Sequence, residues 1–204
     1  MTRVVIIDYG MCNLDSVARA VEECGGRALV TQHPADLAGA SHIILPGVGA
    51  FPDAMDRLRR TGMDAALREQ VVGELIPFLG ICLGMQLMAT RGFEVRESPG
   101  LDLIPGEVRR LMPTGSRVRI PHIGWNEVQA TEDCPLFTGI PARSDFYFVH
   151  SYHLCCDMKF AAAHTPYADG FVAAVQRGNT FGTQFHPEKS QRLGFRLLAN
   201  FLAL

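Results

Sequence analysis

The sequence predicts a single α/β domain, residues 1–204, with an open and mainly parallel sheet, helices on both faces, and a mixed or antiparallel extension in the second half. In the first half, short apolar runs alternate with longer segments of helical period, which is typical of parallel strands covered on both faces. Residues 92–183 hold several short apolar runs separated by Pro, Gly and Asp. The 204 residues, 48% of them hydrophobic, suffice for one full core without a dividing linker.

The first half gives the order strand, helix, strand, loop, strand, which indicates parallel strands joined by right-handed crossovers. Strands are expected at residues 3–8, 28–31, 42–45 and 77–81. Between the first two, apolar residues recur at helical spacing until Gly25-Gly26 ends the pattern, namely Leu14, Val17, Ala18, Val21 and Cys24. A second helical stretch runs over residues 53–72, with an interruption at Gly62.

The second half predicts the extension and then a return to the parallel sheet. Its apolar runs are residues 107–111, 118–120, 126–129, 146–149, 160–164 and 171–176. A last strand is expected at residues 180–185. A closing helix follows, whose apolar face consists of Leu193, Leu197, Leu198, Phe201 and Leu202.

Composition excludes several classes of function. A formal charge of −2 and the absence of any basic run of five argue against nucleic-acid or anionic-membrane binding. Only four apolar residues precede Asp8, too few for a signal peptide or a membrane span, so we expect a cytoplasmic protein. The six cysteines include no C-x-x-C pair, and in that compartment they are expected to be free thiols.

The first informative site is Cys82, which has glycines two residues before and after it. Gly80 and Gly84 lie where an apolar run changes to a helical period. A nucleophile on a tight strand-to-helix turn needs such neighbours, because backbone must pass close to it. The start of a helix also favours the reactive thiolate. A buried cysteine that acts only as a small hydrophobe is the alternative, and the glycines alone do not exclude it.

The second informative site is His186-Pro187-Glu188. Proline disfavours helical backbone at His186, so we expect the three residues to be extended. Side chains two residues apart would then lie on one side, with Cα atoms roughly 6.5 Å apart, and Glu188 could hold the imidazole in one tautomer. A solvated surface turn is the alternative for this tripeptide.

Taken together, the Cys82 site and the His186-Pro187-Glu188 site indicate a function more specifically than either does alone. Both follow parallel strands at their carboxyl ends, where open α/β sheets bring distant segments to one edge. Cysteine, histidine and a carboxylate form a complete acyl-transfer set. The loop at residues 47–49 could add oxyanion donors, with the Leu83 N–H as a second.

These motifs resemble the class I (triad) glutamine amidotransferases, through Gly80-Ile81-Cys82-Leu83-Gly84-Met85-Gln86 and His186-Pro187-Glu188. More narrowly, the chain resembles the glutaminase subunits of imidazole glycerol phosphate synthases, which serve histidine biosynthesis. Motifs from end to end carry this second resemblance: Asp8-Tyr9-Gly10-Met11 with Asn13-Leu14, Pro46-Gly47-Val48-Gly49-Ala50-Phe51, Pro121-His122-Ile123-Gly124-Trp125-Asn126, Tyr147-Phe148-Val149-His150-Ser151-Tyr152, and Gly182-Thr183-Gln184-Phe185 running on to Lys189-Ser190.

The resemblance implies a flavodoxin-like fold and hydrolysis of L-glutamine to glutamate and ammonia through a thioester. Cys82 would attack the carboxamide, His186 would protonate ammonia and activate water, and Glu188 would align His186. The resemblance further implies oxyanion donors at Val48 or Gly49 and at Leu83. It also implies that Gln86 and the backbone at Ser151 and Tyr152 hold the amino-acid end of glutamine.

The resemblance also implies a partner, a (β/α)8-barrel cyclase that receives ammonia and makes imidazole glycerol phosphate and an aminoimidazole carboxamide ribotide. The residues that match its interface are Asn13, Trp125, Tyr147 and Lys189. Trp125 could instead be a core or loop anchor. Cys12 stands where the family usually has glycine, which leaves three readings: a strained or shifted loop, a second reactive cysteine, and an accommodated loop residue.

Other readings remain open from sequence. A paralogous amidotransferase feeding another acceptor, such as a sugar, would share the same local chemistry, and a catalytically silent glutamine-binding subunit is a further alternative. We expect no cofactor and no metal. Cys155 and Cys156, near His150 and His153, would point to opposite faces of a strand, which is poor zinc-ligand geometry. His122 and His164 are assigned to loop or core packing.

Overall fold

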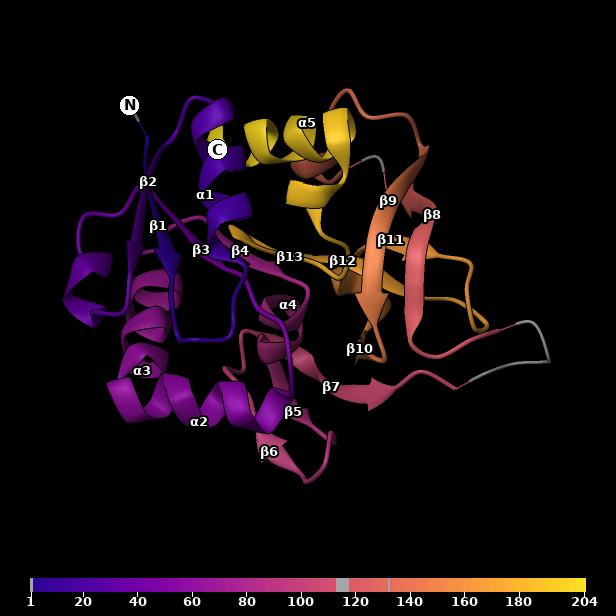
Figure 1. Cartoon of the computed structure of the whole chain (residues 1–204), viewed down its shortest axis with the longest axis horizontal. Coiled ribbons are helices and arrows are strands. Elements are labelled where there is room, and N and C mark those ends of the chain that lie inside the picture. Colours follow the sequence, from indigo (N-terminus) through magenta and orange to yellow (C-terminus); the bar gives the residue numbers. More distant parts are fainter. Residues whose placement is uncertain (1, 113–117, 132) are drawn as a thin grey trace.

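A computed structural model describes residues 2–112, 118–131 and 133–204, and it confirms the predicted α/β architecture. A nine-stranded sheet has the order β2-β1-β3-β4-β13-β12-β11-β8-β9 (Figure 1). The first five strands in this order are mutually parallel, and the order 2-1-3-4 followed by β13 is that of a flavodoxin-like sheet. They are β1 (Arg3–Ile7), β2 (Arg27–Thr31), β3 (His42–Leu45), β4 (Phe78–Ile81) and β13 (Thr180–Thr183).

Helices cover both faces of the parallel strands, as the apolar runs predict. α1 (Leu14–Glu23) and α5 (Gln191–Leu202) lie on one face, and α2 (Phe51–Thr61) and α3 (Met63–Arg68) on the other (Figure 1). In β1, Val4 and Ile6 pack with the first pair of helices, whereas Val5 and Ile7 pack with the second pair. The chain leaves α2 at Gly62, whose φ of 73° ends the helix, and α3 continues as a wider turn, η2 (Glu69–Gly73).

The predicted extension is antiparallel. β12 (Phe171–Arg177) pairs with β13, and β11 (Ala161–Thr165), β8 (His122–Ala130) and β9 (Arg143–His150) follow outward. Short turns of 3-10 helix occur at η1 (Pro34–Leu37), η3 (Pro135–Phe137) and η4 (Met158–Phe160). β8 and β9 therefore form the far edge of the large sheet, away from β2.

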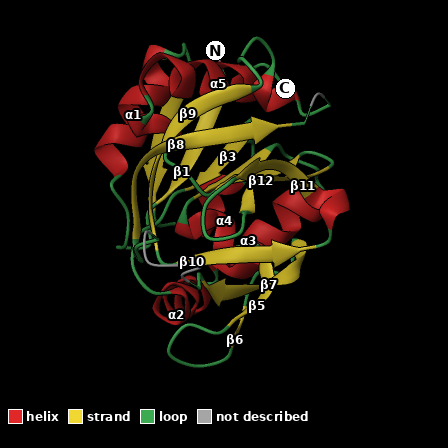
Figure 2. Cartoon of the chain, turned by 90° about the vertical axis from the view of Figure 1, so that its right-hand side faces the viewer, coloured by secondary structure: helices red, strands yellow, loops and turns green. Residues whose placement is uncertain are grey.

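A second sheet lies beside the first and was not predicted as such. Its order is β10 (Tyr152–Cys156), β7 (Ile104–Arg110), β5 (Ala89–Gly92) and β6 (Ser98–Pro99), as Figure 2 shows. β5 and β6 lack apolar runs, and their pairing with distant strands defines them. The short helix α4 (Leu83–Leu87) connects β4 to this sheet.

Two local predictions are wrong. Residues 118–120 are not a strand, because the Arg119 backbone N–H and C=O both bond to the Tyr167 hydroxyl, at 3.0 and 2.7 Å, and not to a neighbouring strand. His186 is extended, but Pro187–Lys189 forms a 3-10 turn, η5, which the Lys189 N–H closes onto the His186 carbonyl at 3.1 Å. Among the described residues, no helix is both long and apolar enough to cross a membrane.

Candidate active site

Cys82 lies on a strained turn between β4 and α4. Its φ of 53° and ψ of −107° are sparsely populated by residues with a side chain, at a cost of about 1–3 kcal/mol. The Cys82 N–H donates to the Thr183 carbonyl at 2.7 Å, which ties the turn to β13. The glycine spacing has a direct reason, since a Cβ on Gly84 would lie 1.7 Å from the Leu45 carbonyl oxygen and one on Gly80 would lie 2.6 Å from the Gly84 oxygen.

His186 and Glu188 follow β13, the neighbour of β4. His186 Nδ1 lies 2.8 Å from a Glu188 carboxylate oxygen, and the two side chains are 4% and 2% exposed. Burial lowers the pKa of His186, but interactions with Cys82 and with the Glu188 carboxylate outweigh it and raise that pKa to about 9. Among the described residues, His186 Nε2 has no hydrogen-bond partner. Glu188 thus fixes one ring nitrogen and leaves the other for a reacting group.

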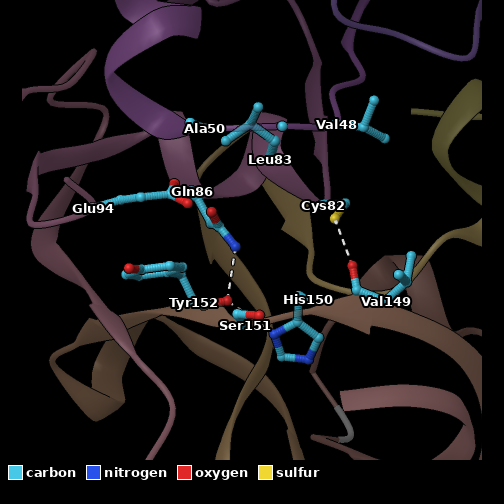
Figure 3. Close-up of a pocket in the computed structure, with 11 residues that line it drawn as sticks. Val48, Ala50, Cys82, Leu83, Gln86, Glu94, Val149, His150, Ser151 and Tyr152 are labelled. Atoms are coloured by element: carbon cyan, nitrogen blue, oxygen red, sulfur yellow. Dashed lines mark hydrogen bonds between the residues drawn. The ribbon is translucent and has the colours of Figure 1, made fainter. Parts of the chain in front are cut away.

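A cavity of about 450 Å³ opens beside Cys82 (Figure 3). One wall is the loop after β3 with the start of α4, and the other runs from the end of β9 to the start of β10. The lining residues are Val48, Gly49, Ala50, Cys82, Leu83, Gln86, Glu94, Val149, His150, Ser151 and Tyr152. Of the residues singled out from sequence, the nucleophile, all three oxyanion candidates and all three glutamine-binding candidates border this one cavity.

Gln86 is buried and connects the two walls. Its side-chain amide donates to the Tyr152 carbonyl at 2.8 Å, a bond that Figure 3 shows, and to Gln184 Oε1 at 3.1 Å. The Gln184 amide in turn lies 3.7 Å from Cys82 Sγ. Gln86 therefore positions the backbone at Ser151 and Tyr152 and, through Gln184, the surroundings of the thiol.

Two of the three candidate oxyanion donors, the Val48 and Leu83 N–H groups, are occupied in this structure. The Val48 N–H donates to the Met11 carbonyl at 2.8 Å, and the Leu83 N–H points to the Gly47 carbonyl at 3.3 Å. One peptide unit, between Gly47 and Val48, supplies both the N–H and the carbonyl concerned. A single rotation of that peptide would free both donors.

Cys12 lies beneath this loop without backbone strain. Its thiol donates to the Pro46 carbonyl at 3.3 Å, and it is not among the residues with positive φ. Burial raises its pKa to about 11. The backbone geometry excludes the strained loop, and the raised pKa argues against a reactive thiol, so Cys12 is accommodated as a loop residue.

Sequence reasoning missed Glu94. It lies in the loop after β5, and its carboxylate accepts the Phe51 N–H at 2.8 Å at the edge of the cavity. Partial burial raises its pKa. No motif or periodicity around Glu94 marks it, because it reaches the cavity only through the unpredicted sheet. Gln184 and His150 belong to sequence motifs, but those motifs do not indicate what either side chain does.

The proposed interface residues fall into two groups. Trp125 on β8 is 47% exposed and packs edge-on against Tyr147 on β9, with ring centroids 6.1 Å apart, so it is not a core anchor. The Tyr147 carbonyl accepts the His186 N–H at 2.9 Å, and Lys189 lies in η5, directly after Glu188. Asn13 is exposed at the start of α1. Trp125, Tyr147 and Lys189 thus lie next to the His186 segment, whereas Asn13 comes from another element.

The cysteines and histidines of β10 do not gather into a larger cluster. Cys155 Sγ lies 3.6 Å from His153 Nε2, and over the described ranges no three His, Cys, Asp or Glu side chains come together as possible metal ligands.

Comparisons with known proteins agree with this geometry. The family described as glutamine amidotransferase class-I matches residues 5–204. The chain is 46% identical over 201 residues to "Imidazole glycerol phosphate synthase subunit HisH 1" of Campylobacter jejuni (strain RM1221), covering 98% of this chain and 100% of that protein. It is 48% identical over 202 residues to "Imidazole glycerol phosphate synthase subunit HisH" of Moorella thermoacetica, with 98% and 94% covered.

The fold has solved counterparts. A crystal structure described as glutamine amidotransferase superposes with a TM-score of 0.76 at 17% identity, covering 98% of this chain and 99% of that one. That likeness shows the fold, and the family match over residues 5–204 shows the membership. The chain belongs to the class I glutamine amidotransferases.

Proposed function

We propose that this chain is the glutaminase subunit of an imidazole glycerol phosphate synthase and that Cys82, His186 and Glu188 are its catalytic triad. The observation that carries the triad is the buried His186–Glu188 pair, 2.8 Å apart, which directly follows β13, the neighbour of the strand that leads into the strained Cys82 turn. Near-complete coverage by relatives of that name supports the pathway.

In the proposed reaction, the Cys82 thiolate attacks the carboxamide carbon of glutamine and forms a C–S bond. His186 Nε2, which has no partner among the described residues, donates its proton to the departing nitrogen, and ammonia leaves. His186 then removes a proton from water as the water attacks the thioester. The C–S bond breaks, glutamate is released, and Glu188 keeps the ring aligned throughout.

Oxyanion stabilisation requires a change in the loop. The Val48 and Leu83 N–H groups are bonded to Met11 and Gly47, so neither is free to stabilise a tetrahedral oxyanion as the loop stands. Rotation of the Gly47–Val48 peptide would turn the Val48 N–H toward Cys82 and release the Leu83 N–H. Gly49, with a φ of 103°, supplies a flexible neighbour for that rotation.

The far end of the cavity suits the amino-acid end of glutamine. Glu94 offers a carboxylate for the α-ammonium, and the backbone at Ser151 and Tyr152, held by Gln86, offers partners for the α-carboxylate and ammonium. These contacts would fix the substrate so that its carboxamide reaches the Cys82 sulfur.

The relatives are named as subunits of imidazole glycerol phosphate synthase, so a partner is expected, and we propose a (β/α)8-barrel cyclase. Ammonia released into water would become ammonium and lose its nucleophilicity, so docking must cover its exit. The exposed Trp125 with Tyr147 and Lys189, which lie next to the His186 segment, is the surface we propose for that contact, together with Asn13.

The test is a glutaminase assay with and without the cyclase and its ribulose phosphate substrate. Cys82→Ala should abolish glutamine-dependent synthesis and leave synthesis from ammonium salts intact in the complex. Glutamine-dependent turnover by Cys82→Ala would rule out the triad. Glutamate formation that no cyclase stimulates, combined with activity beside a different synthetase, would rule out the proposed pathway.

A further inference from the structure

A row of polar side chains, of which His122 and His150 are buried and Asn126 is half-buried, runs from β8 to the cavity, and the triad mechanism does not use it. Asn126 Nδ2 lies 3.2 Å from His122 Nε2, and His122 Nδ1 lies 3.0 Å from His150 Nε2. His150 Nδ1 lies 2.9 Å from the Tyr152 carbonyl oxygen. We call Asn126, His122 and His150 the imidazole chain. From the sequence, His122 is expected to serve only loop or core packing.

The partners at the two ends fix the direction of every bond. The Tyr152 carbonyl only accepts, so His150 Nδ1 carries a proton. Neutral His150 then has a bare Nε2, so the donor to it is His122 Nδ1–H, and neutral His122 accepts at Nε2 from Asn126. The Asn126 orientation has independent support, since its Oδ1 accepts the Glu127 N–H at 2.9 Å and leaves Nδ2 toward His122.

Both rings are neutral in this setting. Burial lowers the pKa of His122 to about 4 and that of His150 to about 3. His122 stacks on Tyr167, with ring centroids 4.1 Å apart, and also contacts Phe148 and Phe171. In such surroundings a neutral imidazole with both nitrogens bonded has one tautomer available, here the Nδ1–H form of each ring.

The imidazole chain ends at the cavity wall that faces Cys82. The Tyr152 carbonyl accepts from both His150 and Gln86, and Gln86 continues through Gln184 to within 3.7 Å of Cys82 Sγ. Figure 3 shows His150 beneath the Ser151–Tyr152 backbone, on the side opposite Leu83. Without its donor at Nε2, His150 would be free to change tautomer and present a lone pair to the Tyr152 carbonyl.

We propose that His122, with Asn126, is a positioning residue for glutamine binding, which acts by locking the His150 tautomer and thereby the Tyr152 carbonyl at the cavity wall. This inference rests on the proposed glutaminase function. It assigns His122 a directional hydrogen bond, and not volume, as its contribution. Substitutions that separate these two contributions therefore test it.

Two variants do so. His122→Phe keeps an aromatic ring against Tyr167 but removes the donor to His150. His122→Asn loses the stacking but places an amide N–H where Nδ1 was. In the complex with the cyclase, we expect His122→Phe to raise the KM for glutamine about fivefold with a smaller change in kcat, the effect of about one hydrogen bond. His122→Asn should stay within about twofold of wild-type KM and show the lower Tm.

The opposite order, with His122→Asn the poorer enzyme and His122→Phe unaffected, would overturn the proposal, because packing alone predicts it. A second measurement needs no activity. Nitrogen-15 NMR of labelled histidine should show His122 and His150 as Nδ1–H tautomers, and His150 changed in His122→Phe. An Nε2–H form of either ring in the wild type would also overturn it. If the wild-type complex hydrolyses no glutamine, the proposed function fails. The NMR measurement of the two tautomers still tests whether the hydrogen bonds of the imidazole chain run in the proposed direction.

Discussion

Replacing Glu188 by Gln tests the electrostatic side of the proposed triad with little change in shape. The carboxylate bonds His186 Nδ1 through one oxygen, at 2.8 Å, and its other oxygen, Oε2, has no partner among the described residues. Glutamine keeps an acceptor for Nδ1, and its amide replaces an oxygen that made no bond. The substitution therefore removes the negative charge and keeps the contact.

The size of the effect follows from the burial of the pair. A hydrogen bond to a charged group contributes about 1.5–3 kcal/mol and a neutral one about 1 kcal/mol, so the charge accounts for about 0.5–2 kcal/mol. Since 1.36 kcal/mol corresponds to one pKa unit, the pKa of His186 should fall by about one unit from its value of about 9. Solvent does not screen the charge interaction between Glu188 and His186, because the two side chains are only 2% and 4% exposed.

The assay is a titration of the His186 ring signals by NMR from about pH 6 to pH 10, with Glu23→Gln as the matched control. Glu23 is the exposed last residue of α1, and its replacement should leave the pKa of His186 unchanged. We also expect kcat/KM to fall about tenfold in Glu188→Gln. An unchanged His186 pKa in Glu188→Gln would refute the assignment of Glu188 as the charged orienting partner.

Three further outcomes are expected. Gly84→Ala should lower the free energy of unfolding by about 3 kcal/mol in urea titrations, because its Cβ would meet the Leu45 carbonyl at 1.7 Å, whereas Gly73→Ala, with open space, should be neutral; equal effects would contradict the close approach. The raised pKa of His186 means that the folded state holds its proton more tightly, so this group's contribution of about 3 kcal/mol is full below about pH 6.5 and is lost as pH rises through about 9; stability that is flat over this range would contradict the assignment. Trp125→Ala should weaken binding to the cyclase about 30-fold by calorimetry with an unchanged Tm, since the ring is 47% exposed, and an unchanged affinity would place the interface elsewhere.

The parallel core was predictable because local and tertiary preferences coincide there. The runs at residues 3–8, 42–45 and 77–81 are apolar throughout, and their strands are indeed covered on both faces. β5 and β6 were not predictable, since Ala89-Thr90-Arg91-Gly92 and Ser98-Pro99 have no periodic signal and become strands only by pairing with partners folded elsewhere.

In the site, too, some residues were predictable from local sequence and others were not. Cys82 and its glycines form a local steric requirement, so spacing revealed them, and His186 with Glu188 are two residues apart. The extended backbone predicted for Glu188 was wrong, yet the bond formed, because a 3-10 turn also brings residues i and i+2 within reach. Glu94 and the imidazole chain depend on which strands lie side by side, and no sequence spacing encodes that.

The two walls of the cavity are held by different kinds of bond, and this difference bears on how activity could be controlled. The loop wall depends on the Gly47–Val48 peptide, whose bonds to Met11 and Leu83 can be exchanged for others at about 1 kcal/mol each. The opposite wall depends on Tyr152, held from two sides by His150 and Gln86 in a buried network where an unpaired group costs more. A docked partner would therefore meet least resistance at the loop, while the proposed role of the imidazole chain is to hold the Ser151–Tyr152 backbone in place as the loop changes.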